Sequence, residues 1–194
     1  MSKKALLIVD VQNDFCPGGA LGIKGADKII PAINRYISKF HKNNYLIIAT
    51  CDWHPAESTH FVRRGGLWPI HCVAETKGAE FYSELKIPDD IVIVYKGTGI
   101  NEDGYSAVSA KAVDGRILIE LLRDNNVEEV YICGLATDYC VKFSTLDLTN
   151  EEFKIYVLLD AIKAVNLKPD DELIALKAMR EAGAIMIKED EINI

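Results

Sequence analysis

No stretch of this sequence is apolar over the roughly 20 residues that a membrane-spanning helix needs. The first apolar run, residues 5–9, stops at Asp10, which also makes it too short for the apolar part of a secretion signal. A basic surface for nucleic acid is missing as well, because the formal net charge is −7 and acidic residues are spread along the chain. We therefore expect a cytoplasmic protein without a membrane or nucleic-acid partner.

The sequence also lacks a cysteine framework, internal repeats and low-complexity tracts. Its five cysteines are an odd number with no repeated spacing, at positions 16, 51, 72, 133 and 140. Disulfide-linked domains normally carry an even set in an exported chain, so we expect five free thiols. With 194 residues, of which 49% are hydrophobic, the chain can fill one substantial core, and we expect a single domain spanning residues 1–194.

Short, nearly continuous apolar runs alternate with longer amphipathic segments. Such runs are typical of strands buried on both faces of a sheet, and they predict six strands, at residues 5–9, 45–49, 91–95, 129–133, 154–159 and 184–187. Apolar residues at helical spacing predict helices at 27–42, 114–125 and 169–182, with Asp114 as an N-cap and Gly183 just past a helix end. This alternation predicts an α/β fold, a three-layer sandwich around a six-stranded parallel sheet.

Ligands bind to open parallel sheets beyond the carboxyl ends of the strands, so the residues that follow each predicted strand are the first candidates for a site. These positions hold Asp10, the cluster 52–54, Lys96 and the turn 134–140. Residues 52–78 form a long irregular connection, and a loop of that length is uncommon unless it serves a site or is disordered. Its tryptophans and histidines favour a site.

Cys140 is the candidate nucleophile. A predicted strand ends at Cys133, a glycine turn follows, and Thr137 or Asp138 can cap a helix whose first turn contains Cys140. Free N–H groups and the positive end of the helix dipole would lower the pKa of the thiol and offer donors to an oxyanion. A lone cysteine is more often a small core residue, and the position at a helix start brings the two interpretations level.

Asp10 and Lys96 are the candidate partners of this thiol. A carboxylate at the end of the first strand can act as general base toward a thiol and as general acid toward a leaving amine, although a cap or a salt bridge is the simpler role. A lysine at the end of the third strand can hold both neighbours anionic and polarise an amide, although most lysines are solvated surface charges. Each residue alone is weak evidence, and their shared edge of the sheet is what favours catalysis.

A second candidate site surrounds Asp52-Trp53-His54. Three of the four histidines lie between positions 54 and 71, which is unusual for scattered surface residues. A carboxylate with several imidazoles suits zinc, iron or manganese, so we expect one divalent ion, with zinc favoured. The predicted ligands are Asp52, His54, His71 and, as an optional fourth, His60. The alternatives are a histidine cluster held by hydrogen bonds, or a ligand set that uses Cys51 and Cys72, whose spacing matches no common zinc pattern.

Phe15 and Trp68 lie in irregular segments beside glycine or proline residues. Aromatic residues are usually part of a core, and that is the commoner role for either of them. If both line the site, they would hold a flat aromatic ring between them.

Five groups of residues resemble the isochorismatase-like cysteine hydrolases, and in particular their nicotinamidase branch. These groups are 7–15 with 18–21, 52–55, 68–73, 96–97 and 134–141, and weaker similarity at 164–166 and 182–184 extends the resemblance over essentially the whole chain. Asp10, Lys96 and Cys140 match the triad of the superfamily. The acid and the two histidines at 52, 54 and 71 match the metal ligands that mark the nicotinamidase branch.

The resemblance implies a strand order of 3-2-1-4-5-6 and a reaction. The reaction is hydrolysis of nicotinamide to nicotinate and ammonia, a step of NAD salvage, through a thioester on Cys140; pyrazinamide is a near-isostere that the same site should accept. The N–H groups of Ala136 and Cys140 would form the oxyanion hole, next to a cis peptide bond between Leu135 and Ala136.

The resemblance also implies how the substrate is held. The metal would take the ring nitrogen, and Phe15 and Trp68 would pack against the ring. Tyr105 would belong to a further wall of the pocket, in a short segment where Val108 replaces a phenylalanine common in relatives. His60 aligns with a fourth ligand that only some members use.

Two other functions stay open at this point. A hydrolase of another amide, such as a carbamoylated amine, would use the same triad, but its relatives lack the Asp-x-His metal site. A non-catalytic binding protein with this fold would be expected to have lost a triad residue, and all three are present. The chain could act as a monomer or as a homo-oligomer.

Overall fold

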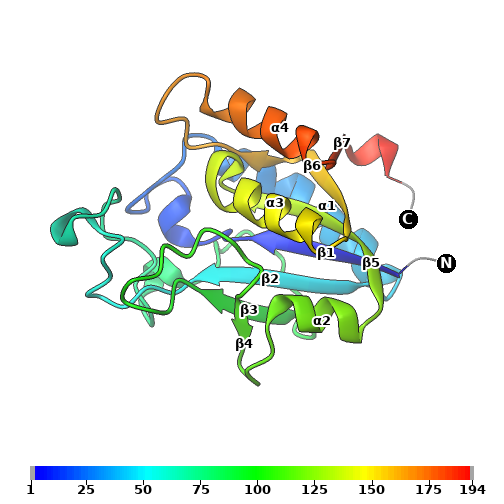
Figure 1. Ribbon diagram of the computed structural model, residues 1–194, viewed down its shortest axis with the longest axis horizontal. Helices are drawn as coiled ribbons and strands as arrows, with labels where there is room; N and C mark the ends of the chain where they lie inside the picture. The colour runs from blue at the N-terminus through cyan, green and yellow to red at the C-terminus, as the bar shows by residue number, and fades with distance from the viewer. Residues whose placement is uncertain (1–2, 193–194) are drawn as a thin grey trace.

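The structure is a computed structural model that describes residues 3–192 (Figure 1). Within this range the strands are β1 (Lys3–Val9), β2 (Leu46–Asp52), β3 (Val92–Lys96), β4 (Lys111–Ala112), β5 (Val127–Leu135), β6 (Lys154–Lys163) and β7 (Ile185–Ile187). The α-helices are α1 (Ile30–Lys42), α2 (Leu118–Asp124), α3 (Lys142–Asn150) and α4 (Asp171–Glu181). Short 3-10 turns occupy Asn13–Phe15, Ala26–Ile29, Val62–Arg64, Lys77–Ala79 and Glu189–Glu191, and a π-helical turn, Thr137–Val141, precedes α3.

The strands form one sheet in the order β4-β3-β2-β1-β5-β6-β7. All neighbouring pairs are parallel except β3 with β4. The six predicted strands are present in the order that the resemblance implies, so the predicted fold class is confirmed. The predicted number of strands was wrong by one, because the two residues of β4 add an antiparallel edge strand that is too short to leave a periodic signal.

Side chains of the sheet alternate between two cores on its opposite faces. Leu6 and Ile8 of β1 belong to the core that α1 covers, whereas Leu7 and Val9 belong to the core that α2, α3 and α4 cover. The helices accordingly lie on the two sides of the sheet in Figure 1. Burying one large apolar side chain is worth about 1.5–3 kcal/mol. A sheet that is apolar on both faces is therefore most stable when helices cover both of them, which gives three layers.

The predicted N-cap of α2 was wrong. The helix begins at Leu118, because Asp114 accepts hydrogen bonds from the N–H and the guanidinium of Arg116 in the turn that joins β4 to α2. The carboxylate of Glu120 accepts the N–H of Ile117 instead, at 3.0 Å, and so satisfies one of the free donors at the start of the helix.

The other two predicted helices are present, but α1 begins three residues and α4 two residues later than predicted, at Ile30 and Asp171. Pro31 lies in the first turn of α1, where its missing N–H has no helical partner to lose. Gly183 follows α4 with φ +104°, a left-handed conformation that glycine adopts without strain.

The carboxyl ends of β1, β2, β3 and β5 meet at one edge of the sheet. Residues 53–82 of the connection between β2 and β3 and the connection 97–110 gather around this edge, at the left of Figure 1; residues 83–91 lead back to the start of β3. All five cysteines are free thiols, as predicted. No helix among residues 3–192 has the length and apolar character to cross a membrane.

Candidate active site

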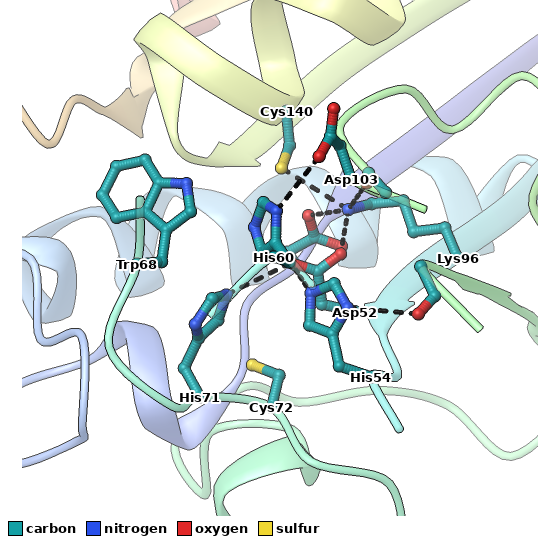
Figure 2. Close-up of polar contacts among 12 residues, drawn as sticks. Asp52, His54, His60, Trp68, His71, Cys72, Lys96, Asp103 and Cys140 are labelled. Atoms are coloured by element: carbon teal, nitrogen blue, oxygen red, sulfur yellow. Dashed lines mark hydrogen bonds and ion pairs between the residues drawn. The ribbon is translucent and has the colours of Figure 1, made fainter. Parts of the chain in front are cut away.

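Three charged side chains from neighbouring strands converge at this edge. Asp10 follows β1, Asp52 ends β2 and Lys96 ends β3, and their exposed fractions are 0%, 3% and 4%. The ammonium of Lys96 lies 2.7 Å from Asp10 Oδ2 and forms an ion pair with Asp52. It also donates to the carbonyl of Gly104 at 2.5 Å and to Cys140 Sγ at 3.4 Å (Figure 2).

The predicted triad is therefore brought together. One carboxylate oxygen of Asp10, one of Asp52 and the sulfur of Cys140 all lie within 4.8 Å of one another, and Lys96 contacts all three residues. Three residues that are far apart in the chain thus meet because each stands at the carboxyl end of a strand or in the turn that follows it.

Asp10 is held in place by Thr50 of β2. The hydroxyl of Thr50 donates to Asp10 Oδ1 at 2.5 Å and accepts the N–H of Asp10 at 3.1 Å. The backbone of Asp10 has φ +48°, and β1 ends at this turn of the chain. The alternation of side chains along a strand puts Thr50 on the same face of β2 as Asp52, which is why both reach the same site.

Burial and charge set the protonation states of these groups. Burial raises the pKa of Asp10 to about 6, although Lys96 opposes the shift. Burial also disfavours the charged form of Asp52, but Lys96 and His54 outweigh it and hold the pKa of Asp52 below its usual range. Burial alone would lower the pKa of Lys96, yet Asp10 and Asp52 hold it well above the usual value. Near neutral pH, Asp10 is therefore ionised and able to take up a proton.

The pKa of the Cys140 thiol differs from the predicted direction. The position at a helix start predicted a lowered pKa, but burial raises the pKa well above its usual range, against the opposing effect of Lys96. The thiol is buried, and the carboxylates of Asp10 and Asp52 beside it raise the pKa further. Cys140 is consequently a neutral thiol at rest, and a nucleophilic attack by its sulfur needs a neighbouring base.

Cys140 lies in the π-helical turn between β5 and α3. The peptide bond between Leu135 and Ala136 is cis, as predicted. Ala136 stands directly before the turn, and both Ala136 and Cys140 line the same pocket. Single π-helical turns of this kind often occur at functional sites.

The predicted caps of this turn were wrong. The hydroxyl of Thr137 is buried and has no hydrogen-bond partner in the part of the chain that the structure describes. The carboxylate of Asp138 turns away from the helix start and accepts the N–H groups of Val165 at 2.9 Å and Asn166 at 2.8 Å. Asp138 therefore ties the loop after β6 to the turn that holds the nucleophile, a role that its local sequence does not indicate.

The three histidines predicted as ligands form one buried cluster (Figure 2). One ring nitrogen from each of His54, His60 and His71 lies within 4.8 Å of the others. Asp52 Oδ2 lies 3.6 Å from His54 Nε2 and 4.0 Å from His71 Nε2. The rival ligands Cys51 and Cys72 do not belong to this cluster.

Two of these imidazoles have a fixed tautomer. His54 Nδ1 donates to the carbonyl of Gly97 at 3.1 Å, and His71 Nδ1 donates to the carbonyl of Pro69 at 2.8 Å. Because a carbonyl oxygen can only accept, the proton is on Nδ1 and the lone pair is on Nε2. Gly97 is needed for this approach, since its φ is +65° and a Cβ there would lie 2.5 Å from His54 Cε1.

The cluster fits a divalent metal ion. His54 Nε2 is buried and has no hydrogen-bond partner within residues 3–192, a situation that costs about 1–3 kcal/mol unless another group takes up the lone pair. Burial lowers the pKa of His60 to about 4 and the pKa of His71 below its usual value, so both rings are neutral near pH 7, as metal ligands must be. His60 Nδ1 also lies 3.5 Å from the exposed carboxylate of Asp103.

A pocket lies between the triad and the histidine cluster. Its lining residues are Phe15, Leu21, Asp52, His60, Trp68, His71, Tyr105, Ala136, Tyr139, Cys140 and Val165. Trp68 Nε1 donates to the hydroxyl of Tyr105 at 2.9 Å, and the rings of Trp68 and Tyr139 pack edge to face with their centroids 4.8 Å apart. The ring of Phe15 lies 5.4 Å from that of His71. All three aromatic residues predicted to contact substrate thus reach the wall of this pocket.

Sequence reasoning missed three apolar or aromatic residues of this wall, namely Leu21, Tyr139 and Val165. Each belongs to a segment of the resemblance, which is the signal that could have found them. Asp103 was also missed, because an exposed acid in a loop gives no pattern that connects it to His60.

The fold and this edge of the sheet define the class of protein. An open, mainly parallel sheet with a buried thiol, a carboxylate and an ammonium group at its carboxyl edge is typical of an α/β enzyme with a cysteine nucleophile. The chain belongs to the isochorismatase domain family, whose model matches residues 4–191.

Relatives with known names agree with this assignment. The chain is 35% identical to the nicotinamidase of Escherichia coli over 202 residues, which cover 96% of this chain and 95% of the relative. The crystal structure of the pyrazinamidase of Pyrococcus horikoshii in complex with zinc is 45% identical, with a TM-score of 0.88 over 96% of this chain and 99% of that one. The structure of PnC1 from L. infantum in complex with nicotinate is 31% identical, with a TM-score of 0.87 over 97% and 94% of the two chains.

Proposed function

We propose that this chain is a nicotinamidase that hydrolyses nicotinamide to nicotinate and ammonia, and that it also accepts pyrazinamide. The observation that carries the proposal is a single pocket with the Cys140 thiol on one side, imidazoles of the histidine cluster on another, and Phe15 and Trp68 in its wall. A flat ring with a carboxamide at one end and a ring nitrogen at the other matches these three features. The relatives named nicotinamidase and pyrazinamidase, and the relative whose structure contains nicotinate, support this substrate class.

Acylation begins with a proton transfer from the Cys140 thiol to the carboxylate of Asp10. The sulfur forms a bond to the carboxamide carbon, and the carbonyl oxygen takes up the negative charge, which the N–H groups of Ala136 and Cys140 stabilise. The C–N bond then breaks, and Asp10 returns the proton to the leaving nitrogen, which departs as ammonia. A thioester between Cys140 and the acyl group remains.

Deacylation uses the same groups in the reverse direction. Asp10 takes a proton from a water molecule while the water oxygen attacks the thioester carbon and forms a second oxyanion. The C–S bond breaks when this oxyanion collapses. The sulfur receives the proton from Asp10, and the acid product leaves. Lys96, 2.7 Å from Asp10 Oδ2 and 3.4 Å from Cys140 Sγ, stabilises the negative charge that moves between these two groups.

The residues that would hold the metal ion are Asp52, His54, His71 and His60, and we propose zinc as the native ion. When bound, the ion supplies a Lewis-acid position that can accept the lone pair of a ring nitrogen. The relative in complex with zinc supports this choice. Asp52 has a second function, since it also pairs with Lys96 and so holds the ammonium between the two halves of the site.

The experiment that tests the function measures ammonia release from nicotinamide by the zinc-loaded protein, beside a carbamoylated amine as the competing substrate class. Turnover of nicotinamide and not of the carbamoylated amine is expected. Cys140→Ala should abolish turnover and leave zinc content and the far-UV circular dichroism spectrum unchanged. A zinc-loaded, folded protein that is inert to nicotinamide would refute the proposed substrate, and appreciable activity in Cys140→Ala would remove this thiol from the nucleophile role.

A further inference from the structure

Gln12 makes three hydrogen bonds from a fully buried side chain. Its Nε2 donates to the carbonyls of Asp52 at 2.9 Å and Ala79 at 2.8 Å, and its Oε1 accepts the N–H of Asp52 at 2.9 Å. Gln12 does not line the pocket, so it is not placed to touch substrate. Both N–H donors and the acceptor oxygen of its amide instead form hydrogen bonds with backbone groups, and two of these three bonds go to one residue, Asp52.

The position of Gln12 explains why these bonds are needed. β1 and β2 pair from Ala5 with Leu46 to Ile8 with Ala49. Beyond that point β1 ends and the chain turns at Asp10, whereas β2 continues to Asp52 and pairs with β3 on its other side. The N–H and the carbonyl of Asp52 on the side of β1 would be left unpaired in a buried place, which folded proteins avoid. The carboxamide of Gln12 supplies one donor and one acceptor there, as a peptide group of a neighbouring strand would.

We propose that Gln12 is a positioning residue for the metal centre, which it holds through the main chain of Asp52. This inference rests on the metal-binding role of Asp52 in the proposed function. The carboxylate of Asp52 is shared between two partners, because one oxygen pairs with Lys96 and the other faces the histidine cluster, 3.6 Å from His54 Nε2. A main chain free to move at position 52 would misplace both oxygens. Gln12 therefore fixes the ligand geometry without being a ligand.

The test is the dissociation constant for zinc, measured without substrate by competition with a chromogenic zinc chelator. Gln12→Met keeps a side chain of similar length and removes all three hydrogen bonds. Mutation of a residue that hydrogen-bonds to a metal ligand typically weakens metal binding by about 10–100-fold, and a weakening of that size is expected for Gln12→Met. The second variant, Gln12→Glu, keeps the shape and an acceptor for the N–H of Asp52 but removes both donors, and it should weaken zinc binding as well.

A matched control comes from Asn34 of α1. Its side-chain amide also bridges backbone groups, since Nδ2 donates to the carbonyl of Glu84 at 2.9 Å and Oδ1 accepts the N–H of Lys86 at 2.8 Å. Asn34→Leu should lower thermal stability and leave the zinc dissociation constant within about twofold of the wild type, because this bridge joins α1 to the loop before β3 and involves no predicted ligand.

Two results would overturn the inference. One is a zinc dissociation constant within twofold of the wild type in a folded Gln12 variant, and the other is an equal loss of zinc affinity in Asn34→Leu. A wild-type protein without zinc affinity would refute the proposed metal centre and this inference together, and it is recognised before any variant is compared. Zinc binding by a protein that does not hydrolyse nicotinamide would refute the proposed substrate alone, since the comparison of zinc constants does not depend on turnover.

Discussion

Replacing Lys96 by methionine should expose how strongly the site depends on one buried ammonium group. Lys96 lies 2.7 Å from Asp10 Oδ2, pairs with Asp52, and is almost fully buried with both carboxylates. Methionine has a similar length and no charge. The variant therefore removes the charge and the hydrogen bonds while it keeps much of the packing, and it leaves two buried carboxylates without their cation.

The magnitude follows from the geometry. Two unit charges 2.7 Å apart attract each other by about 6 kcal/mol at an effective dielectric constant of about 20, and the desolvation of both ions offsets a large part of this. Removing one partner of a buried pair typically destabilises a protein by about 3–5 kcal/mol, and we expect a loss of unfolding free energy in that range near pH 8.

The loss should become smaller as the pH falls. Burial already raises the pKa of Asp10 to about 6, and without Lys96 the pKa should rise further. A carboxyl group whose pKa is higher in the folded than in the unfolded state binds its proton more tightly when folded, so it contributes stability at low pH that is lost as the pH rises through the folded pKa. The difference between the variant and the wild type should therefore shrink between about pH 8 and about pH 5.

Urea unfolding at both pH values, with a chelator in every sample so that zinc binding does not contribute, measures this difference. The control is Lys154→Met, because Lys154 is exposed, pairs with Glu129 at 3.7 Å and lies over the ring of Tyr156 at the surface. Exposed pairs of this kind contribute little. A loss in Lys96→Met that equals that of Lys154→Met, or one that does not depend on pH, would contradict the role given to the buried ammonium.

Four further outcomes are expected. His71→Ala should lower zinc content and raise KM for nicotinamide together, as metal analysis after dialysis and initial rates would measure, and unchanged zinc occupancy would count against the ligand set. The profile of kcat/KM should fall below about pH 6, because Asp10, whose pKa burial raises to about 6, cannot accept the thiol proton once it is protonated. A kcat/KM of the wild type that stays flat through this range at constant zinc content would exclude Asp10 as the base. Thr50→Val removes a hydrogen bond that lowers the pKa of Asp10, so in this variant the fall of kcat/KM should move to higher pH. Asp138→Ala frees the N–H of Val165, a residue of the pocket wall, and should raise KM several-fold with a smaller change in kcat; Asp138→Asn, which keeps one acceptor, should lie between, and an unchanged KM would show that other contacts hold the loop.

The layers of the fold could be predicted from the sequence because each main strand is buried on both faces and therefore reads as an apolar run. The ends of the strands could not. β5 continues through Gly134 to Leu135, and β6 continues past Asp160 to Lys163, where glycine or a charged residue interrupts the apolar pattern. β4 consists of two residues, so its pairing with β3 is visible only in the structure.

The candidate site divides in the same way. Residues whose chemistry is distinctive and whose place is the end of a strand, such as Asp10, Lys96 and Cys140, could be found from residue type and position. Gln12 and Thr50 could not, because each acts on a residue 40 positions away and the sequence does not tell which groups are left without a partner there. The predicted pKa of Cys140 was wrong for a related reason, since a helix start is a local feature and burial depends on the whole fold.

The most direct test of the central claim is a crystal structure of Cys140→Ala with zinc and nicotinamide bound. It should show zinc held by Asp52, His54 and His71, and the carboxamide carbon facing position 140 on the side of Asp10. Zinc bound elsewhere, or a carboxamide turned away from both position 140 and Asp10, would contradict the account.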